Sequence, residues 1–170
     1  MANGVRLEWN GLDRVLAEAG KKLKARRGAM LHDIGETLVN NAKWRFQEGK
    51  GPDGKDWEPS ARAAHGGKTL IGEGDLRRSI THAVTQDGVL VGSNKVYARI
   101  HQMGGTIRPK KGKYLKFKGQ DGQDVFVKEV TIPARPYLGF NKEDREDVAD
   151  VLNQYLAECL SVDGGSRGRP

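Results

Sequence analysis

Apolar residues recur at helical spacing through the first third of the chain. One stripe predicts a helix that begins after the capping residue Asn10, with Leu12, Val15, Leu16, Ala19 and Leu23 on a single face. A second stripe recurs every four positions and predicts a helix over residues 29–47, with an apolar face of Met30, Ile34, Leu38, Ala42 and Phe46. Because Gly28 stands between the stripes, we expect two N-terminal helices, separated or bent at that glycine.

The periodicity stops over residues 48–74, a stretch with seven glycines and two prolines. These residues favour turns over helix or long strand, so we expect a long loop. Trp57 is the one large apolar residue that could anchor this loop to the core or to a neighbouring subunit. Residues 75–80 are typical of one short helical turn, with Leu76 and Ile80 facing inward.

Period-two patterns dominate the next sixty residues. We expect strands over 81–85 and 89–92, joined at the turn Asp87-Gly88, and further strands over 114–118 and 124–132. A short helix over 97–102 separates the two pairs and is stopped by Gly104. The last helix begins at Asn141, with Asp144 at the capping-box position. Its apolar face comprises Val148, Val151, Leu152, Tyr155, Leu156 and Cys159.

These elements predict an α+β fold: a mainly antiparallel sheet packed by two N-terminal helices and a C-terminal helix, with long glycine-rich loops. At 170 residues and 36% hydrophobic composition, the chain is long enough for one domain with its own core. We place this domain at residues 1–162 and expect residues 163–170, DGGSRGRP, to form a flexible tail.

The net charge of +7 is unevenly distributed. Residues 108–118 hold six basic residues and no acidic residue, whereas the last helix is acidic. A second basic cluster over residues 21–27 is interpreted as the solvated, cationic C-terminal end of the first helix, which suits the helix dipole. The charge therefore indicates either nucleic acid or an acidic protein surface as the partner of residues 108–118.

Little in the sequence indicates catalysis. The acidic cluster of Asp53, Asp56 and Glu58 could hold a divalent ion in a metal-dependent nuclease, but it is more typical of a solvated turn. The four histidines show no metal-ligand spacing, Cys159 fits a core position, and neither a nucleophile elbow nor a phosphate loop is present. We expect a non-enzymatic protein without a cofactor. A single cysteine fits a reducing compartment, and neither a signal peptide nor a transmembrane run is expected.

Four segments carry a resemblance to a known family. They are RF (45–46) with PDGKDWEP (52–59), LIGEGDLRRSI (70–80), VGSNKVYARIHQMGG (91–105) and IPARPYLG (132–139). In this order they resemble the signature segments of the phage virion morphogenesis family, the tail-completion proteins of Mu-like and P2-like contractile-tailed phages. The resemblance covers about residues 5–160. Glu73 departs from it, standing where a threonine is commoner.

The resemblance implies structural roles for most of the matching residues. They are Pro52, Gly54, Gly74, Leu76, Tyr97, His101, Gly104, Pro133, Arg135 and Pro136. The two prolines around Arg135 stiffen the exit from a strand, and its guanidinium could face a carboxylate. As contacts for partners we name Trp57 and the basic segment, comprising Arg108, Lys110, Lys111, Lys113, Lys116 and Lys118.

The resemblance also implies a virion assembly protein without known catalysis, similar to tail terminators. Such a protein forms a ring, most simply a hexamer, at the head-proximal end of the tail. There it stops tube and sheath growth and enables joining to the head. The expected partners are further copies of the chain, tail tube and sheath proteins, and head–tail connector proteins; no membrane is involved. DNA passes through the lumen without specific binding. The protein would be assembled in the host cytoplasm and reside in the tail or neck of the virion.

The alternative is a nucleic-acid-binding protein that uses residues 108–118. Tyr114 and Phe117 could stack on bases. However, lysine gives little base readout, and strand residues three apart face opposite sides. Docking of this segment on an acidic protein surface, of which the last helix of an adjacent copy is one, is the hypothesis that we favour.

Overall fold

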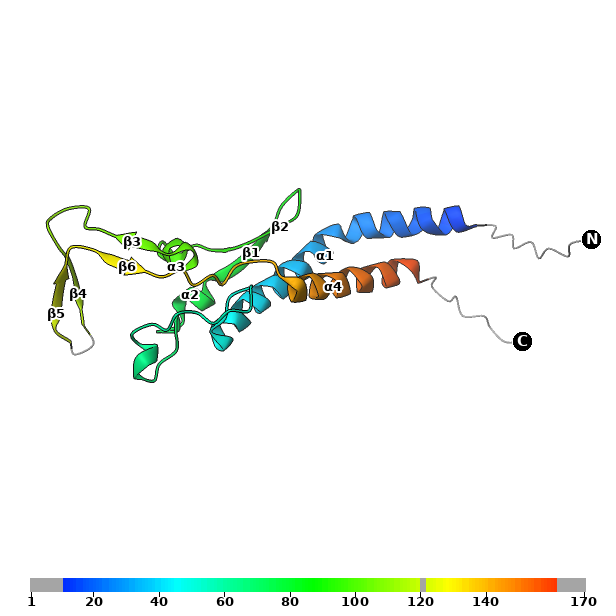
Figure 1. The fold of residues 1–170 in the computed structure, drawn as a ribbon. Coiled ribbons are helices and arrows are strands. Elements are labelled where there is room, and N and C mark those ends of the chain that lie inside the picture. The colour runs from blue at the N-terminus through cyan, green and yellow to red at the C-terminus, as the bar shows by residue number, and fades with distance from the viewer. Residues whose placement is uncertain (1–10, 120–121, 162–170) are drawn as a thin grey trace, which may run out of the picture.

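The computed structural model describes residues 11–119 and 122–161 and confirms the α+β class. Helices α1 and α4 lie side by side at one end of an elongated molecule, and a small β ribbon forms the other end (Figure 1). The elements in chain order are α1 (Leu12–Glu48), a 3-10 turn (Ala63–His65), α2 (Asp75–Arg78), β1 (Ile80–Val84), β2 (Val89–Ser93), α3 (Ala98–Met103), β3 (Gly105–Ile107), β4 (Leu115–Lys118), β5 (Asp124–Val127), β6 (Val130–Ile132) and α4 (Lys142–Leu160). Within the described residues, no helix has the length and apolar character needed to cross a membrane.

The expected pair of N-terminal helices is wrong, because α1 is one helix of 37 residues that runs through Gly28. A glycine inside a helix costs only about 1 kcal/mol relative to alanine, and Gly28 is flanked by the good helix formers Ala25, Arg26, Arg27 and Ala29. The capping residue expected at Asn10 lies outside the described residues, and Gly11 at the start of α1 makes no side-chain cap.

The basic cluster over residues 21–27 is therefore in the middle of a helix rather than at its end. The helix dipole does not account for it there, because that effect is confined to the terminal turns. Two of its members have specific partners instead: Arg26 pairs with Glu158 of α4, and Arg27 donates a hydrogen bond of 2.6 Å to the carbonyl oxygen of Gln86.

Helix α4 begins with the capping box expected from the sequence. The Asn141 side chain accepts from the backbone N–H of Asp144 at 2.8 Å, and the Asp144 carboxylate accepts from the backbone N–H of Asn141 at 2.8 Å. The helix runs antiparallel to α1 and buries Tyr155 and Cys159. The hydroxyl of Tyr155 donates a hydrogen bond to the carboxylate of Asp33 in α1. Leu156, placed on the apolar face from the sequence, is 42% exposed.

The strands form three separate two-stranded antiparallel ribbons rather than one sheet. Ribbon β1–β2, the predicted hairpin, pairs Ile80 with Ser93 and packs on α1. The single strand expected over residues 124–132 is wrong. It divides at residues 128–129 into β5, which pairs with β4, and β6, which pairs with β3. Strand β3 was not expected, because residues 105–107 are too few to show a period.

The core lies between the C-terminal half of α1, β1, α2, α3 and the segment before α4. It comprises Val39, Ala42, Phe46, Trp57, Leu76, Ile80, Ala98 and Tyr137. Leu76 and Ile80 face inward as expected, being 4% and 2% exposed. The tail expected over residues 163–170 lies outside the described residues.

The continuity of α1 predicts the effect of a single methyl group. A Cβ at Gly28 meets no atom within 4 Å, and its backbone is helical, so Gly28→Ala should raise the free energy of unfolding by about 0.5–1 kcal/mol. Urea denaturation measures this. The matched control is Gly49→Ala at the C-cap, where φ is 74° and alanine should destabilise. A break at Gly28 would instead make both variants less stable.

Candidate functional site

Trp57 fixes the long glycine-rich loop to the core of its own chain. Its ring is 6% exposed, and its Nε1 donates a hydrogen bond of 2.8 Å to the carbonyl oxygen of Pro136. Phe46 meets it edge to face at 5.5 Å between ring centroids, and Tyr137 packs against Phe46 at 4.9 Å. The ring of Trp57 is therefore covered inside the monomer, which leaves little of it for a partner.

Gln102 joins α3 to the segment that precedes α4. Its Oε1 accepts from the backbone N–H groups of Tyr137 and Leu138, both at 3.0 Å, and its Nε2 donates to the carbonyl oxygen of Leu138 at 2.8 Å. This side chain satisfies three backbone groups that belong to no strand. Sequence reasoning quoted Gln102 within a motif but assigned it no role, because its partners are 35 residues away.

Arg135 lies between the long loop and α3. Its Nε donates to the carbonyl oxygen of Glu58 at 2.7 Å, and its backbone N–H donates to the carbonyl oxygen of His101 at 2.8 Å. We expected this guanidinium to face a carboxylate. That expectation is wrong for the described residues, because the guanidinium donates its hydrogen bonds to the backbone carbonyl oxygens of Glu58 and Pro59. Arg135 is 6% exposed and holds residues 58–59 in place.

The motif glycines and prolines occupy positions with steric constraints. Gly104 has φ of 69°, and a Cβ there would lie 2.7 Å from the backbone nitrogen of Ala134, next to Pro133. Gly74 precedes α2 with φ of 81°, and Gly54 closes the turn after Pro52 with φ of 75°. Only residues that tolerate a left-handed backbone fit these turns without strain. The geometry therefore gives these residues structural roles.

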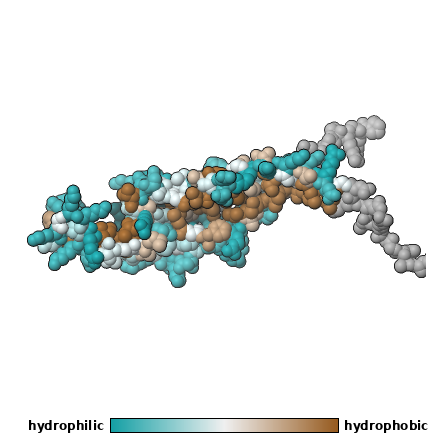
Figure 2. Space-filling model, turned by 90° about the horizontal axis from the view of Figure 1, so that it is seen from above, coloured by the Kyte–Doolittle hydropathy of each residue, from teal (hydrophilic) through white to brown (hydrophobic). Residues whose placement is uncertain are grey.

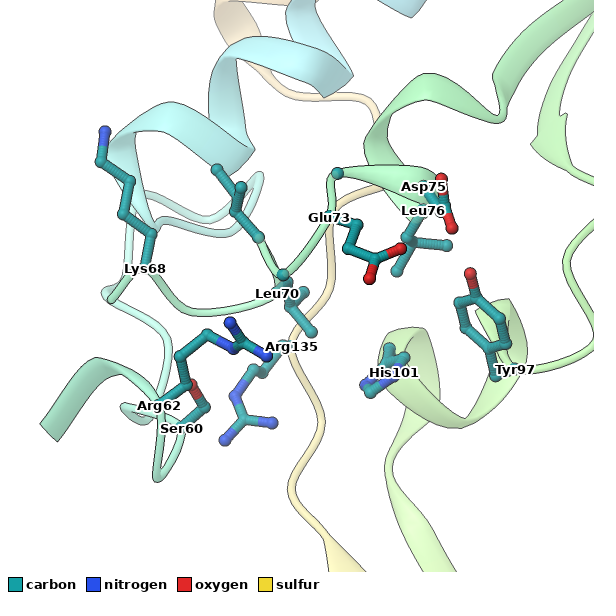
Figure 3. Close-up of a pocket in the computed structure, with 13 residues that line it drawn as sticks. Ser60, Arg62, Lys68, Leu70, Glu73, Asp75, Leu76, Tyr97, His101 and Arg135 are labelled. Carbon is teal, nitrogen blue, oxygen red and sulfur yellow. The ribbon is translucent and has the colours of Figure 1, made fainter. Parts of the chain in front are cut away.

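A cavity of about 430 Å³ opens where three of the four motif segments meet (Figure 3). His101, Tyr97 and Leu76 lie on one side of it, while Arg62 and Arg135 lie on the other. The Nδ1 atom of His101 is buried without a partner among the described residues. Burial, and next the positive charge of Arg135, lower the pKa of His101. The lowered pKa therefore favours the neutral imidazole of His101 at this position.

The described residues do not assemble a metal site from three or more His, Cys, Asp or Glu side chains. Asp53, Asp56 and Glu58 are exposed, and Asp53 pairs with Lys55 at 3.5 Å in its own turn. Sequence spacing missed one contact between histidines: the Nε2 atom of His82 lies 3.0 Å from the Nδ1 atom of His32. The fold brings them together across α1 and β1, 50 residues apart in sequence, so spacing along the chain gave no signal.

The basic segment, residues 108–118, forms the end of the molecule opposite α1 and α4 (Figure 1). Three of its cations have partners within the ribbons. Lys116 and Lys118 pair with Asp124 at 2.8 and 2.9 Å, and Arg108 pairs with Glu129 at 2.9 Å. The other three, Lys110, Lys111 and Lys113, are exposed in the loop between β3 and β4 and pair with no described carboxylate. The loop therefore presents a concentrated positive charge.

Comparison with known proteins shows which family these motif segments belong to. Residues 7–157 match the phage virion morphogenesis family, which spans all four motif segments. The chain belongs to the phage virion morphogenesis family. It is 33% identical over 133 residues to "Putative capsid assembly protein G" of Escherichia phage Mu, covering 72% of this chain and 75% of the relative. It is 28% identical over 132 residues to "Mu-like prophage FluMu G protein 2" of Haemophilus influenzae (strain ATCC 51907 / DSM 11121 / KW20 / Rd), covering 78% and 80%. No solved structure matches it.

Membership of the virion morphogenesis family gives the chain a structural or assembly role in a phage virion. Many of the family's motif residues form the centre described above: the Trp57 anchor, the α2 turn, α3 with Gln102, and the stiff segment around Arg135. The exposed features lie outside these motifs: the part of α1 before Arg45 together with α4 at one end, and the basic segment at the other.

The covered position of Trp57 predicts a large effect of truncation. Trp57→Ala should lower the free energy of unfolding by about 3–5 kcal/mol, because it leaves a cavity beside Phe46 and an unpaired carbonyl at Pro136. Trp57→Phe should cost less. Trp44→Ala, at a side chain that is 65% exposed, is the control and should change stability by no more than about 0.5 kcal/mol. Equal effects at both tryptophans would contradict the anchor.

The lowered pKa of His101 predicts a pH dependence of stability. Because the folded state has the lower pKa, the unfolded chain binds the proton first as the pH falls. The contribution of His101 is therefore fully present above the unfolded value, about 6.5, and is lost as the pH decreases through it. The free energy of unfolding should fall less between pH 7.5 and 5.5 in His101→Gln than in wild type, as measured by urea denaturation. Parallel pH profiles would contradict this.

Proposed function

We propose that this protein is a tail-completion, or terminator, protein. It forms a ring, most simply a hexamer, at the head-proximal end of a phage tail, where it stops tube and sheath growth and gives the head a docking face. Membership of the virion morphogenesis family and similarity to "Putative capsid assembly protein G" of phage Mu support an assembly role. The ring and its place in the tail or neck are the proposal.

The observation that carries this proposal is the division of the molecule into a fixed centre and two exposed ends. Many motif residues lie in or around a buried core, while helices α1 and α4 project from one side of it and the basic segment from the other (Figure 1). A subunit of a ring must contact neighbours on two sides and a different protein along the axis. An elongated subunit with chemically different ends suits this arrangement.

Charge supports an acidic protein as the partner of the basic segment. The cluster of Lys110, Lys111 and Lys113 is exposed and has no described carboxylate partner, so it can meet an acidic surface without breaking an existing pair. Charge complementarity of this kind orients partners and raises encounter rates. DNA must slide through a tail, and strong lysine contacts would retard it, which favours a protein partner.

Nucleic-acid binding stays the alternative, because the same ribbon exposes aromatic rings beside its lysines. Tyr114, Phe117 and Phe126 are 51%, 44% and 58% exposed, and the Nζ atom of Lys116 lies 5.4 Å from the ring centroid of Phe126. If stacking on bases were the function, affinity for single-stranded DNA should be high and should fall steeply with salt.

A phage that carries a conditional null allele of this protein tests the proposal directly. Loss of the protein should yield separate heads and tails, with tails of abnormal length, and reconstruction of complete particles should place the chain at the tail–neck junction. Particles that carry it inside the capsid or at the baseplate would refute the proposal. Normal tails already joined to heads in its absence would do the same.

The exposed lysine cluster predicts the effect of charge reversal. The triple variant Lys110→Glu, Lys111→Glu and Lys113→Glu should lose head–tail joining, with the monomer as stable as wild type because these side chains support no internal contact. Infectious particles and joined tails are counted. The control reverses Lys50, Lys68 and Lys95, which lie elsewhere and likewise pair with no described carboxylate, and should join normally. Normal joining in both variants, or loss of salt-sensitive DNA binding in the first, would contradict docking on protein.

A further inference from the structure

Helix α1 is longer than the helix that it packs against. The antiparallel pair is matched in position by Arg45 with Asp144, Asp33 with Tyr155 and Arg26 with Glu158, and α4 ends at Leu160. Residues 12–25, the turns of α1 before Arg26, therefore lie beside the last turns of α4 or beyond its end (Figure 1). We call these turns the arm.

The arm repeats the apolar pattern that the rest of α1 buries. Leu12, Leu16, Ala19 and Leu23 fall at helical spacing on the same face as the half-buried Met30 and the buried Ile34. Ile34 is 8% exposed, whereas Leu12, Val15 and Leu16 are 37%, 39% and 53% exposed. Ala19 and Leu23 are half-buried. Seen from above, apolar side chains continue from the centre of the molecule out along the two helices (Figure 2). We call Leu12, Val15, Leu16, Ala19 and Leu23 the arm stripe.

An exposed stripe on a projecting helix is costly in two ways. It leaves large apolar side chains in water, and a helical segment of about 14 residues without tertiary packing is marginal in stability. Gly20 within the arm lowers helix propensity further. A partner that covers the stripe would remove both costs.

Charge identifies that partner as α4. The arm carries four basic and two acidic residues, whereas α4 carries six acidic and two basic residues. The same opposition holds the two helices together inside one chain, where Arg26 pairs with Glu158 and lies over the ring of Tyr155. An intermolecular contact between arm and α4 would extend an interface that the fold already uses.

The outer side of α4 also offers the apolar surface that the arm stripe needs. Leu156 and Leu160 are 42% and 47% exposed near its C-terminal end, and Leu152 is half-buried one turn before. Glu146 and Asp150 are exposed nearer its start. One helix thus combines an apolar strip with an acidic border, which matches an apolar strip with a basic border.

We propose that the arm stripe of one copy docks on α4 of a second copy, along Leu156 and Leu160, with Lys22 and Lys24 of the arm facing acidic residues of α4. This deepens the proposed ring, on whose self-association it rests, by naming the contact between neighbouring subunits. The partner helix covers an apolar face that the monomer leaves open, and the arm becomes a fully packed helix only in the assembly.

Sedimentation velocity of the purified full chain, over a range of concentrations, tests this contact. Leu12→Gln, Leu16→Gln and Leu23→Gln together remove the stripe without changing charge, and should weaken self-association by about tenfold or more. The control places glutamine on the opposite face, as Ala17→Gln and Ala25→Gln, and should associate like wild type. Equal thermal unfolding of the core in all three proteins excludes misfolding as the cause.

Mixing two charge-reversed proteins separates the proposed contact from any other. Lys22→Glu with Lys24→Glu in one chain, and Glu146→Lys with Asp150→Lys in another, should each associate weakly alone and recover association when mixed. Hydrogen exchange of residues 12–25 should slow as protein concentration rises, because docking orders the arm.

A monomeric wild type, an unchanged oligomer in the stripe variant, or no recovery on mixing would each overturn the arm contact. These results are independent of the tail assay. If tails require the protein but the stripe variant still associates, the tail function stands and the arm contact fails. If the stripe variant dissociates while tails form normally, the arm contact stands and the terminator function fails.

Discussion

The buried ion pair of Arg45 and Asp144 is the interaction on which the arrangement of the chain depends. Their side chains are 8% and 1% exposed, so both charges have lost most of their water. That loss is tolerable only when the remaining donors and acceptors are satisfied. Here Arg45 also donates to the carbonyl oxygens of Tyr137 and Gly139, both at 3.2 Å, and the Asp144 carboxylate also caps α4 at Asn141. One pair of charges therefore holds three parts of the chain together: α1, the start of α4, and residues 137–139, which precede α4. Removing either partner would leave the other as an uncompensated buried charge.

The position of this pair determines the shape of the molecule. Because it joins the C-terminal part of α1 to the first turn of α4, the two antiparallel helices extend from the core towards the same end of the molecule, where α1 continues past the end of α4 (Figure 1). The ribbons β3–β6 and β4–β5 leave the core on the other side. A core of modest size thus carries two projecting ends. Each end has its own chemistry: apolar and mixed in charge along the helices, and basic along residues 108–118.

Local signals in the sequence predicted the elements, and long-range contacts decided how they combine. The capping box of Asn141 and Asp144 and the turn at Asp87-Gly88 were predictable, because every partner lies within a few residues. Gly28 suggested a helix break that does not exist. The helix-propensity cost of one glycine is small compared with the stabilisation that a long helix gains by packing on α4. Residues 124–132 were predicted as one strand because the alternation of apolar and polar residues indicates which side chains share a face, but not which strand pairs with them. The two halves, β5 and β6, pair with different strands. The partner of Arg45 lies 99 residues away, and no spacing rule could have identified it.

The same distinction separates what motifs and surfaces can reveal about function. A closely packed position such as Gly104 is constrained because a Cβ there would lie 2.7 Å from the backbone nitrogen of Ala134, so few residues fit and a recognisable motif results. An exposed lysine such as Lys111 is constrained only by its charge, and a helical leucine such as Leu16 only by its size and apolar character. The motifs therefore identify the family through its core, whereas the surfaces through which such a protein assembles leave only patterns of charge and hydropathy. Sequence reasoning found one of these patterns, the basic segment, because it is contiguous. It missed the meaning of the other, because the arm stripe looks like an ordinary core face until the structure shows that Leu12, Val15 and Leu16 are exposed near the end of α4.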